Sequence, residues 1–484
     1  MEELDTARVT KKSIHGVFAL TTRTFFIQIV TFISNLLLTI YLAPEVFGIF
    51  FVVSAAIAFL SYFSDIGLAA ALIQKKENIT QDDLKTTFTI QQILVLTVVL
   101  IALLSSGIIG RFYNLTSDGI LLFQALSVSF FLSSLKTIPS IILERNLDFK
   151  KLVIPQIVET LFFNVVAVVL AIQGFGVASF TYAVLARGLT GLITMYLISP
   201  WRISVGITKQ SARRLLSFGF PFQLNSFLAL VKDDLLIVYL GKVLPLAQVG
   251  YIGFAQKWAL MPLRLIMDNV IRITFPSFSR LQDEKEVLSK AIEKSIFAAC
   301  FLIFPALTGL VILSPYFINL IPKYIKWEPA LLSLFFFSIN AALSSVSTPL
   351  TNALNAIGKI KTTLYLMIFW TISTWVLTPF LIIKIGFNGV AIASAIISLS
   401  VVLVVILVKR YISFNIKSAV FYPILSSSVM GVVLYFLASV IASSLLGVFV
   451  CILFSAMLYF LVSFILAKEQ IKKDFALIRQ SLKR

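Results

Sequence analysis

One apolar segment of this chain carries four charged side chains at helical spacing. Lys257, Arg264, Asp268 and Arg272 are separated by 7, 4 and 4 residues. At about 100° per residue, these spacings place all four side chains within about 80° of one another on a helix. Three positive charges against one negative charge suit an anionic ligand. The alternative is a ladder of buried ion pairs whose end side chains reach toward the membrane surface.

Other apolar segments also contain charged and polar side chains. A charge at the centre of a bilayer costs about 2.5–3.5 kcal/mol, so a basic residue inside a span is expected to face a wet cavity or a partner. We assign Arg23 and Lys136 to the same cationic cavity as the first cluster, although Arg23 lies near a span end from which its side chain can also reach the membrane surface. The polar residues expected to line this cavity are Gln28, Thr31, Asn35, Ser61, Asn340, Ser344 and Thr351. Small polar side chains can equally hold helices together in lipid, and the sequence leaves both interpretations open.

Carboxylates inside apolar segments are candidates for an ion-coupling site. They are Asp65, Asp233, Asp234 and Asp268. Lys232, Asp233 and Asp234 are consecutive and cannot share one face of a helix, so one of these carboxylates is expected to pair with the lysine. The spacing does not select among the candidates.

The composition is that of an integral membrane protein. Of the 484 residues, 59% are hydrophobic and 13% are charged, and the mean hydropathy is +0.99. Soluble domains carry about 25% charged residues. The formal net charge is +18, but the basic residues lie in short gaps between apolar runs, which is not the pattern of a nucleic-acid binder.

Cofactor and enzyme chemistry find little support in the sequence. The two cysteines, Cys300 and Cys451, lie inside apolar runs, and His15 is the single histidine. No phosphate-binding loop, dinucleotide motif or metal-ligand spacing is present. We therefore expect no catalytic residue, no metal and no cofactor, and a transporter rather than an enzyme.

An all-α fold with fourteen transmembrane helices is predicted, because about 20 apolar residues cross the hydrocarbon layer. The expected spans are 17–42, 45–73, 87–110, 119–142, 152–173, 175–198, 215–240, 246–276, 291–319, 329–356, 362–384, 387–408, 419–441 and 445–467. With both termini cytoplasmic, 27 Lys and Arg residues fall in cytoplasmic segments and 5 in outer segments. This asymmetry follows the positive-inside rule and indicates a multi-pass protein of the cytoplasmic (inner) membrane.

Short sequence matches recur at a growing offset. Leu38–Leu42 resembles Leu236–Leu240, Val46–Gly48 resembles Val249–Gly250, Thr137–Pro139 resembles Thr348–Pro349, and Gly174–Ala178 resembles Gly386–Ala391. The offset rises from 198 to 213, as insertions into a duplicated half would produce. A repeat of six spans predicts two six-helix lobes related by a pseudo-two-fold axis along the membrane normal, with a cavity between them and two extra C-terminal helices.

The predicted domains follow from these assignments. They are a cytoplasmic segment at 1–16, an N-terminal lobe at 17–198, a cytoplasmic linker at 199–214, a C-terminal lobe at 215–410, spans 13 and 14 at 411–467, and a tail at 468–484. Ile471, Phe475, Ile478 and Leu482 recur at spacings of 4, 3 and 4 among basic residues. We expect the tail to lie on the anionic inner leaflet.

Several segments resemble polysaccharide flippases of the MOP superfamily, specifically the Wzx type that includes colanic-acid and teichuronic-acid exporters. They are Phe63–Gln74, Leu143–Lys150, Ser217–Gly219, Asp234–Ile237, Gly250–Tyr251 and Phe275–Arg280. The resemblance covers about residues 15–410 and departs from the family at Ala178 and in the last four spans.

The resemblance implies a transporter that moves an undecaprenyl-pyrophosphate-linked oligosaccharide from the inner to the outer leaflet by alternating access, for cell-surface polysaccharide synthesis. Arg23, Lys136, Lys257, Arg264 and Arg272 would then bind the pyrophosphate, and the polar residues would bind the glycan. Implied partners are membrane lipids, a polysaccharide polymerase and glycosyltransferases.

Other functions remain open from the sequence. A multidrug exporter of the same superfamily would be expected to show an acidic cavity, whereas these charges are mostly basic. A membrane polymerase or glycosyltransferase would be expected to carry a long outer loop, and the predicted outer segments are short. A scaffold in a polysaccharide assembly complex fits the sequence as well.

Overall fold

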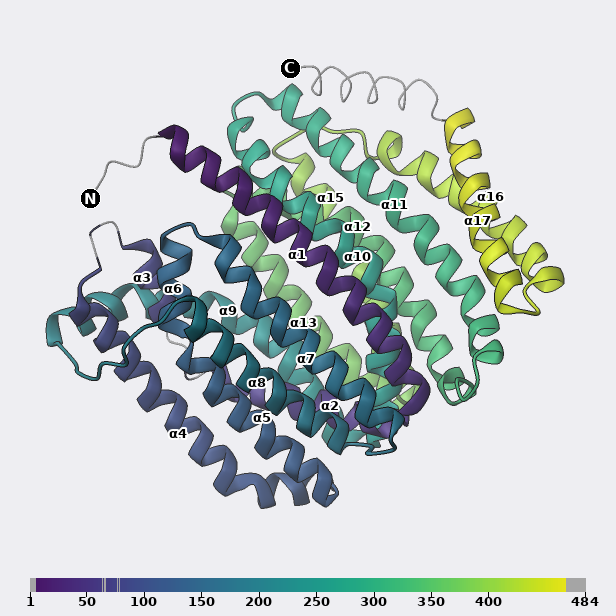
Figure 1. Cartoon of the computed structure of the whole chain (residues 1–484). Helices are drawn as coiled ribbons and strands as arrows, with labels where there is room; N and C mark the ends of the chain where they lie inside the picture. Colours follow the sequence, from purple (N-terminus) through teal and green to yellow (C-terminus); the bar gives the residue numbers. More distant parts are fainter. Residues whose placement is uncertain (1–5, 63, 65–66, 76, 78, 467–484) are drawn as a thin grey trace. The chain divides into compact units, whose positions relative to one another are not determined.

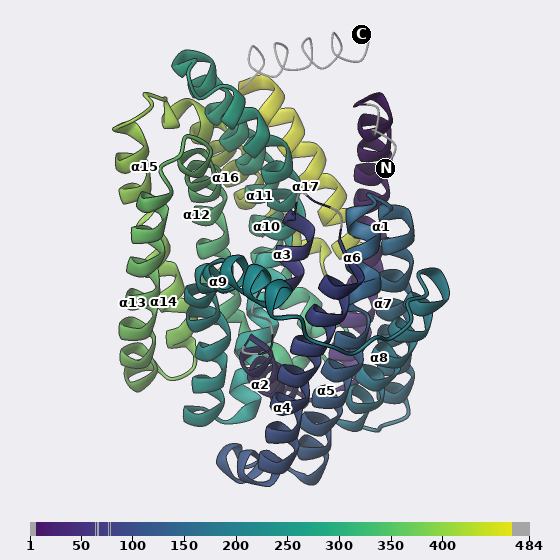
Figure 2. The same cartoon turned by 90° about the vertical axis from the view of Figure 1, so that its left-hand side faces the viewer.

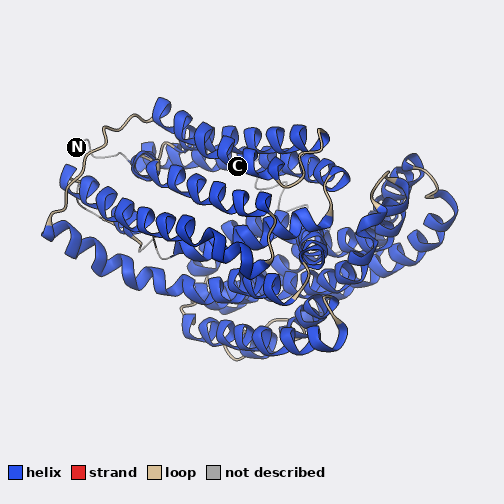
Figure 3. Ribbon diagram, turned by 90° about the horizontal axis from the view of Figure 1, so that it is seen from below, coloured by secondary structure: helices blue, strands red, loops and turns tan. Residues whose placement is uncertain are grey.

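The computed structural model of the chain describes residues 6–62, 64, 67–75, 77 and 79–466 (Figure 1), with the side chains of 6–22, 74, 218–226 and 229 left out. These residues form helices and connecting loops without a strand (Figure 3), which confirms the predicted all-α class. Asp65 and the tail at 468–484 lie outside the described residues.

Seventeen α-helices and one 3₁₀ helix make up the described part of the chain. Their bounds are α1 Thr6–Tyr41, α2 Pro44–Tyr62, α3 Leu68–Gln74, α4 Gln81–Tyr113, α5 Ser117–Leu135, α6 Thr137–Arg145, α7 Phe149–Ile172, α8 Ala178–Ile198, α9 Lys209–Val243, α10 Leu246–Arg280, α11 Lys285–Leu320, η1 Ile325–Ala330, α12 Leu331–Ala356, α13 Ile360–Ile385, α14 Asn388–Ser398, α15 Val401–Lys409, α16 Ile416–Ile441 and α17 Leu445–Leu466.

Twelve helical segments in the described residues are long and apolar enough to cross a membrane. They match twelve of the fourteen predicted spans, and the other two coincide with α9 and α10. Both of these helices are 35 residues long. They carry the charged side chains singled out above, Lys232 to Asp234 on α9 and Lys257 to Arg272 on α10. The charged clusters make α9 and α10 more polar than the twelve apolar segments.

The helices divide into two compact units, Met1–Gly250 and Tyr251–Arg484. In the first unit α7 packs against α8 and α1, α5 against α8, and α9 against α2, α3 and α4 (Figure 2). In the second unit α11 packs against α12 and α16, α12 and α13 against α14, and α16 against α17. The predicted boundary between lobes lies in the linker at 199–214. The structure instead assigns α9 to the first unit, where it packs on α2, α3 and α4. The predicted lobe arrangement therefore stays a prediction.

Turns at equivalent positions of the predicted repeat have the same backbone hydrogen bonds. After α6, Asn146, Leu147 and Asp148 donate backbone hydrogen bonds to Ile142, Glu144 and Leu143. Ile357, Gly358 and Lys359 donate the same three bonds to Ala353, Asn355 and Leu354, 211 residues further on. Leu147 and Gly358 both have a positive φ, of 56° and 76°. The backbone thus repeats residue by residue at this turn.

Two further turns show how the offset grows along the chain. Leu42 and Val46 donate to Leu38 and Ala43, and Leu244 and Gln248 donate to Leu240 and Pro245, which is an offset of 202. The pair Gly174 and Gly386, both with a positive φ, gives an offset of 212. The monotonic growth predicted from the sequence is present. The match of Leu38–Leu42 with Leu236–Leu240 at offset 198 was wrong by four residues, about one helical turn.

Two glycines at repeated positions allow α2 and α10 to approach closely. A Cβ added to Gly48 would lie 1.8 Å from the carbonyl oxygen of Leu246, and one added to Gly250 would lie 1.9 Å from that of Pro44. At offset 202, Gly48 corresponds to Gly250 and Pro44 to Leu246, so the contact is reciprocal. A reciprocal contact between equivalent residues is what a local two-fold relation produces.

We predict that Gly48→Val and Gly250→Val each destabilise the protein by about 1–3 kcal/mol, because the added side chain meets backbone rather than a movable side chain. Thermal unfolding of the purified protein in detergent measures this effect. Gly107→Val is the matched control, since nothing lies within 4 Å of its Cβ position. Equal melting temperatures for all three variants would show that the close crossing is absent.

Candidate functional site

The charged face predicted on α10 is present. The helix runs without interruption from Leu246 to Arg280, so Lys257, Arg264, Asp268 and Arg272 keep the predicted spacing, and all four are exposed. In the described part of the chain, no ion pair joins Asp268 to Arg264 or Arg272, although both stand four residues away. The buried side of the same helix includes Met267 and Phe278. The face therefore carries excess positive charge that its own carboxylate does not neutralise.

The polar stripe predicted on α12 is partly engaged within the protein. Asn340 donates to the carbonyl oxygen of Ser394 at 3.0 Å, which ties α12 to α14. The Thr351 hydroxyl donates to the carbonyl of Thr348, and the Ser344 carbonyl accepts from Thr348. All three predicted residues are half-buried. Asn340 therefore holds helices together, while Ser344 and Thr351 keep accessible side chains.

The other predicted polar residues lie in the first unit. Gln28, Thr31 and Asn35 on α1 are half-buried, as are Arg23 and Ser61. The Ser61 hydroxyl donates to the carbonyl of Ala58 on its own helix.

The carboxylates predicted for ion coupling on α9 are adjacent but differ in exposure. The Lys232 ammonium lies 3.5 Å from Asp233, and Asp233 is exposed. Asp234 is half-buried. This agrees with the expectation that one of the two carboxylates pairs with the lysine.

Lys136 belongs to an ion cluster that the sequence did not reveal. Its ammonium contacts Oε1 of Glu159, and the Nε of Arg187 lies 3.8 Å from Oε2 of the same carboxylate. Lys136 stands at the break between α5 and α6, Glu159 on α7 and Arg187 on α8. We call these three residues the Glu159 cluster. The signal available in the sequence was a carboxylate, Glu159, inside the predicted span 152–173.

Close helix packing holds Glu159 in place. A Cβ on Gly191 of α8 would lie 2.2 Å from Oε1 of Glu159, so a larger residue there would displace the carboxylate from this position. Gly188, one turn away, faces Ser129 of α5, whose hydroxyl donates to the carbonyl of Val184. The two glycines allow α8 to approach α5 and α7 at the level of the cluster.

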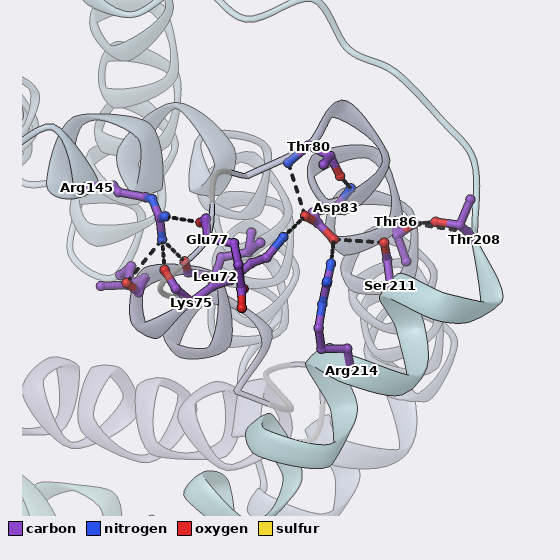
Figure 4. A network of polar contacts seen from close by, with 11 residues as sticks. Leu72, Lys75, Glu77, Thr80, Asp83, Thr86, Arg145, Thr208, Ser211 and Arg214 are labelled. Carbon is purple, nitrogen blue, oxygen red and sulfur yellow. Dashed lines mark hydrogen bonds and ion pairs between the residues drawn. The ribbon is translucent and has the colours of Figure 1, made fainter. Parts of the chain in front are cut away.

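A second polar network, also missed from the sequence, surrounds Asp83 at the start of α4. Figure 4 shows Lys75, Ser211 and Arg214 converging on this fully buried carboxylate, at 2.5, 2.8 and 2.5 Å. Asp83 also completes a capping box with Thr80, which explains why α4 begins there. The network therefore attaches the first turns of α9 to α3 and α4.

Arg145 stabilises the end of the short helix α3 in the same region. Its guanidinium donates to the carbonyl oxygens of Leu72, Lys75 and Glu77 (Figure 4), two of which belong to the last turn of α3 or to the residue after it. A cation at a helix C-terminus interacts favourably with the unpaired carbonyl groups there. Asp83 and Arg145 together form a structural network rather than a ligand site, since their polar groups bond to the protein.

The comparisons with known proteins identify the family. Residues 37–332 match the family described as "Polysaccharide biosynthesis protein". The chain belongs to this family, and its predicted place among the polysaccharide flippases of the MOP superfamily is confirmed.

Curated relatives are identical to the chain at about a quarter of the aligned positions. An "uncharacterized membrane protein in cps region" of Klebsiella pneumoniae is 24% identical over 69% of each chain. The "lipopolysaccharide biosynthesis protein WzxC" of Escherichia coli (strain K12) is 25% identical over 67% of this chain and 66% of its own. The "succinoglycan biosynthesis transport protein ExoT" of Rhizobium meliloti is 23% identical over 63% of this chain and 58% of its own.

Solved structures share the fold at lower identity. The lipid II flippase MurJ in an inward closed conformation has a TM-score of 0.77 at 17% identity, covering 93% of this chain and 99% of its own. An inward-facing multidrug resistance transporter of the MATE family and MOP superfamily has a TM-score of 0.61 at 16% identity, covering 85% and 98%.

We predict that Asp83→Ala destabilises the protein by about 3–5 kcal/mol, because it leaves the buried Lys75 ammonium without its carboxylate. Thermal unfolding in detergent measures the loss. The neighbouring variant Asp82→Ala is the control, since its pair with Lys85 is exposed and contributes about 0–1 kcal/mol. Similar melting temperatures for the two variants would contradict a structural role for the Asp83 network.

Proposed function

We propose that the chain moves an undecaprenyl-pyrophosphate-linked oligosaccharide from the inner to the outer leaflet of the cytoplasmic membrane, for synthesis of a cell-surface polysaccharide. The observation that carries this proposal is the α10 face, where Arg264 and Arg272 are exposed and have no ion pair within the described residues. Family membership supplies the class of cargo, since the named relatives serve polysaccharide synthesis or transport.

The chemistry of a lipid-linked oligosaccharide fits the types of residue predicted to bind it. A pyrophosphate needs cationic hydrogen-bond donors, and an arginine can bind phosphate oxygens with two parallel N–H groups. Lys257, Arg264 and Arg272 supply such donors, and Arg23 adds another from α1. The accessible hydroxyls and amides of Gln28, Thr31, Asn35, Ser344 and Thr351 suit a hydrated glycan. The polyprenyl chain can stay in the lipid phase.

The recurring turns support transport by alternating access. Two halves built from the same turns can open first to one side of the membrane and then to the other around a site near the middle. The reciprocal contact of Gly48 and Gly250 joins α2 and α10, which are the second helix of each predicted half. In the predicted orientation it lies near the outer surface, where it would close the path when the protein opens inward.

The remaining expectations belong to the same proposal. Both termini are cytoplasmic and fourteen helices span the membrane, with α9 and α10 as the seventh and eighth spans. Transport is driven either by the membrane potential or by a Na⁺ or H⁺ gradient. In the second case one or more of Asp65, Asp233, Asp234 and Asp268 carry the coupling ion. A polysaccharide polymerase would consume the product on the outer side, and glycosyltransferases would supply the substrate on the inner side.

We predict that Arg264→Ala lowers transport of a fluorescent lipid-linked oligosaccharide in proteoliposomes at least tenfold, because a hydrogen-bonded charge pair with the pyrophosphate is lost. The control is Lys384→Ala, an exposed residue in the last turn of α13. Protein amount and melting temperature are measured for both. Unchanged transport by Arg264→Ala at normal protein amount would contradict the proposed role of α10.

A further inference from the structure

The Glu159 cluster contains more positive charge than its own carboxylate can neutralise. Lys136 and Arg187 flank Glu159, with side chains 17% and 56% exposed against 10% for Glu159. Lys136 makes the closer contact of the two. One positive charge therefore remains uncompensated between apolar helices, where an unmatched charge is expensive and commonly functional.

The two terminal amino groups of Arg187 are available as hydrogen-bond donors to a ligand. Its one ion pair in the described part of the chain is the 3.8 Å approach of its Nε to Glu159, so its two terminal amino groups bind no carboxylate there. On α8, the Arg187 position lies about 140° around the helix axis from Tyr182. Tyr182, Leu189 and Ile193 lie along one side of this helix. These three residues are exposed apolar side chains. Arg187 thus faces away from the apolar outer row of its helix.

The duplicated half provides an internal comparison for this cluster. At the offsets of 211 and 212 found in the neighbouring turns, the counterparts of Lys136, Glu159 and Arg187 are Ser347, Trp370 and Leu399. The next residue, Ser400, corresponds to Gly188. There the Trp370 indole donates to the Ser400 hydroxyl at 2.8 Å, and no charge is present among these residues. A neutral hydrogen bond is sufficient for helix packing at this level. The charges of the first half are therefore not needed to build the fold.

We propose that Arg187 and Lys136 bind an acidic group of the transported molecule, a carboxylate or a phosphate, and that Glu159 is the positioning residue for both cations. This inference rests on the proposed function. It adds a second anion-binding place, on the first repeat, to the one proposed on α10. An oligosaccharide that carries an acidic sugar as well as a lipid pyrophosphate has two such groups.

The geometry gives each residue a separate part. The guanidinium of Arg187 offers two terminal amino groups in a plane, which matches the two oxygens of a carboxylate or phosphate. Glu159 holds Lys136 through one oxygen and lies near Arg187 through the other. It keeps the two cations together, and its single charge leaves the pair attractive to an anion.

The test compares two lipid-linked substrates in proteoliposomes, both with a pyrophosphate, one with a neutral glycan and one with a uronic acid. For Arg187→Gln we expect a rise in KM of about tenfold with little change in kcat. A rise with the acidic glycan alone assigns the bound group to the sugar carboxylate. A rise with both substrates assigns it to the phosphate, and either result supports the proposal.

Three further variants separate binding from folding. Arg187→Lys keeps the charge and should recover part of the affinity. Glu159→Gln removes the positioning carboxylate and should raise KM in the same substrate-dependent way. Trp370→Phe removes the neutral counterpart in the second half and should leave the KM values unchanged, whatever its effect on the melting temperature.

The result that would overturn the inference is an unchanged KM for both substrates in Arg187→Gln at normal protein amount. In that case wild-type transport would still support the proposed function. If the wild-type protein moved neither lipid-linked substrate, the proposed function itself would fail, so the two failures are distinguishable.

Discussion

Charges that are buried in the protein or that lie in a hydrocarbon layer must be paired or used in function, and this constraint shapes the chain more than any other. Asp83 shows the paired case: a fully buried carboxylate is surrounded by Lys75, Ser211, Arg214 and the turn at Thr80. The α10 face shows the other case, because Arg264 and Arg272 keep excess positive charge with Asp268 nearby but not bonded. The first arrangement stabilises helix contacts, and the second is available to an anionic cargo.

Similar turns recur along the chain, and one charged cluster has no charged counterpart. Hydrogen-bonded turns recur at offsets of 202 and 211, and positive-φ glycines recur at 212. Against this background the Glu159 cluster stands out, since its counterpart around Trp370 and Ser400 is neutral. If the predicted duplication holds, charge in the first half marks a position where the two halves differ in chemistry rather than in packing.

Local features were predictable from the sequence, and contacts between distant segments were not. Helical spacing was enough to place Lys257, Arg264 and Arg272 on one face, because that arrangement depends on one helix. Glu159 was missed because its partners stand on the α5–α6 break and on α8, 23 and 28 residues away in the chain. The role of Asp83 likewise depends on Arg214, 131 residues further on. The close packing of α9 on first-unit helices follows from such contacts, which periodicity cannot reveal.

The central claim is that the excess positive charge binds the pyrophosphate of a lipid-linked oligosaccharide. Equilibrium binding of two ligands to the purified protein tests it most directly: an undecaprenyl-pyrophosphate oligosaccharide, and the same glycan on a polyprenol without phosphate. We predict that removing the phosphates weakens binding at least 100-fold, since several charge-assisted hydrogen bonds are lost together. Equal affinity for the two ligands would contradict the account.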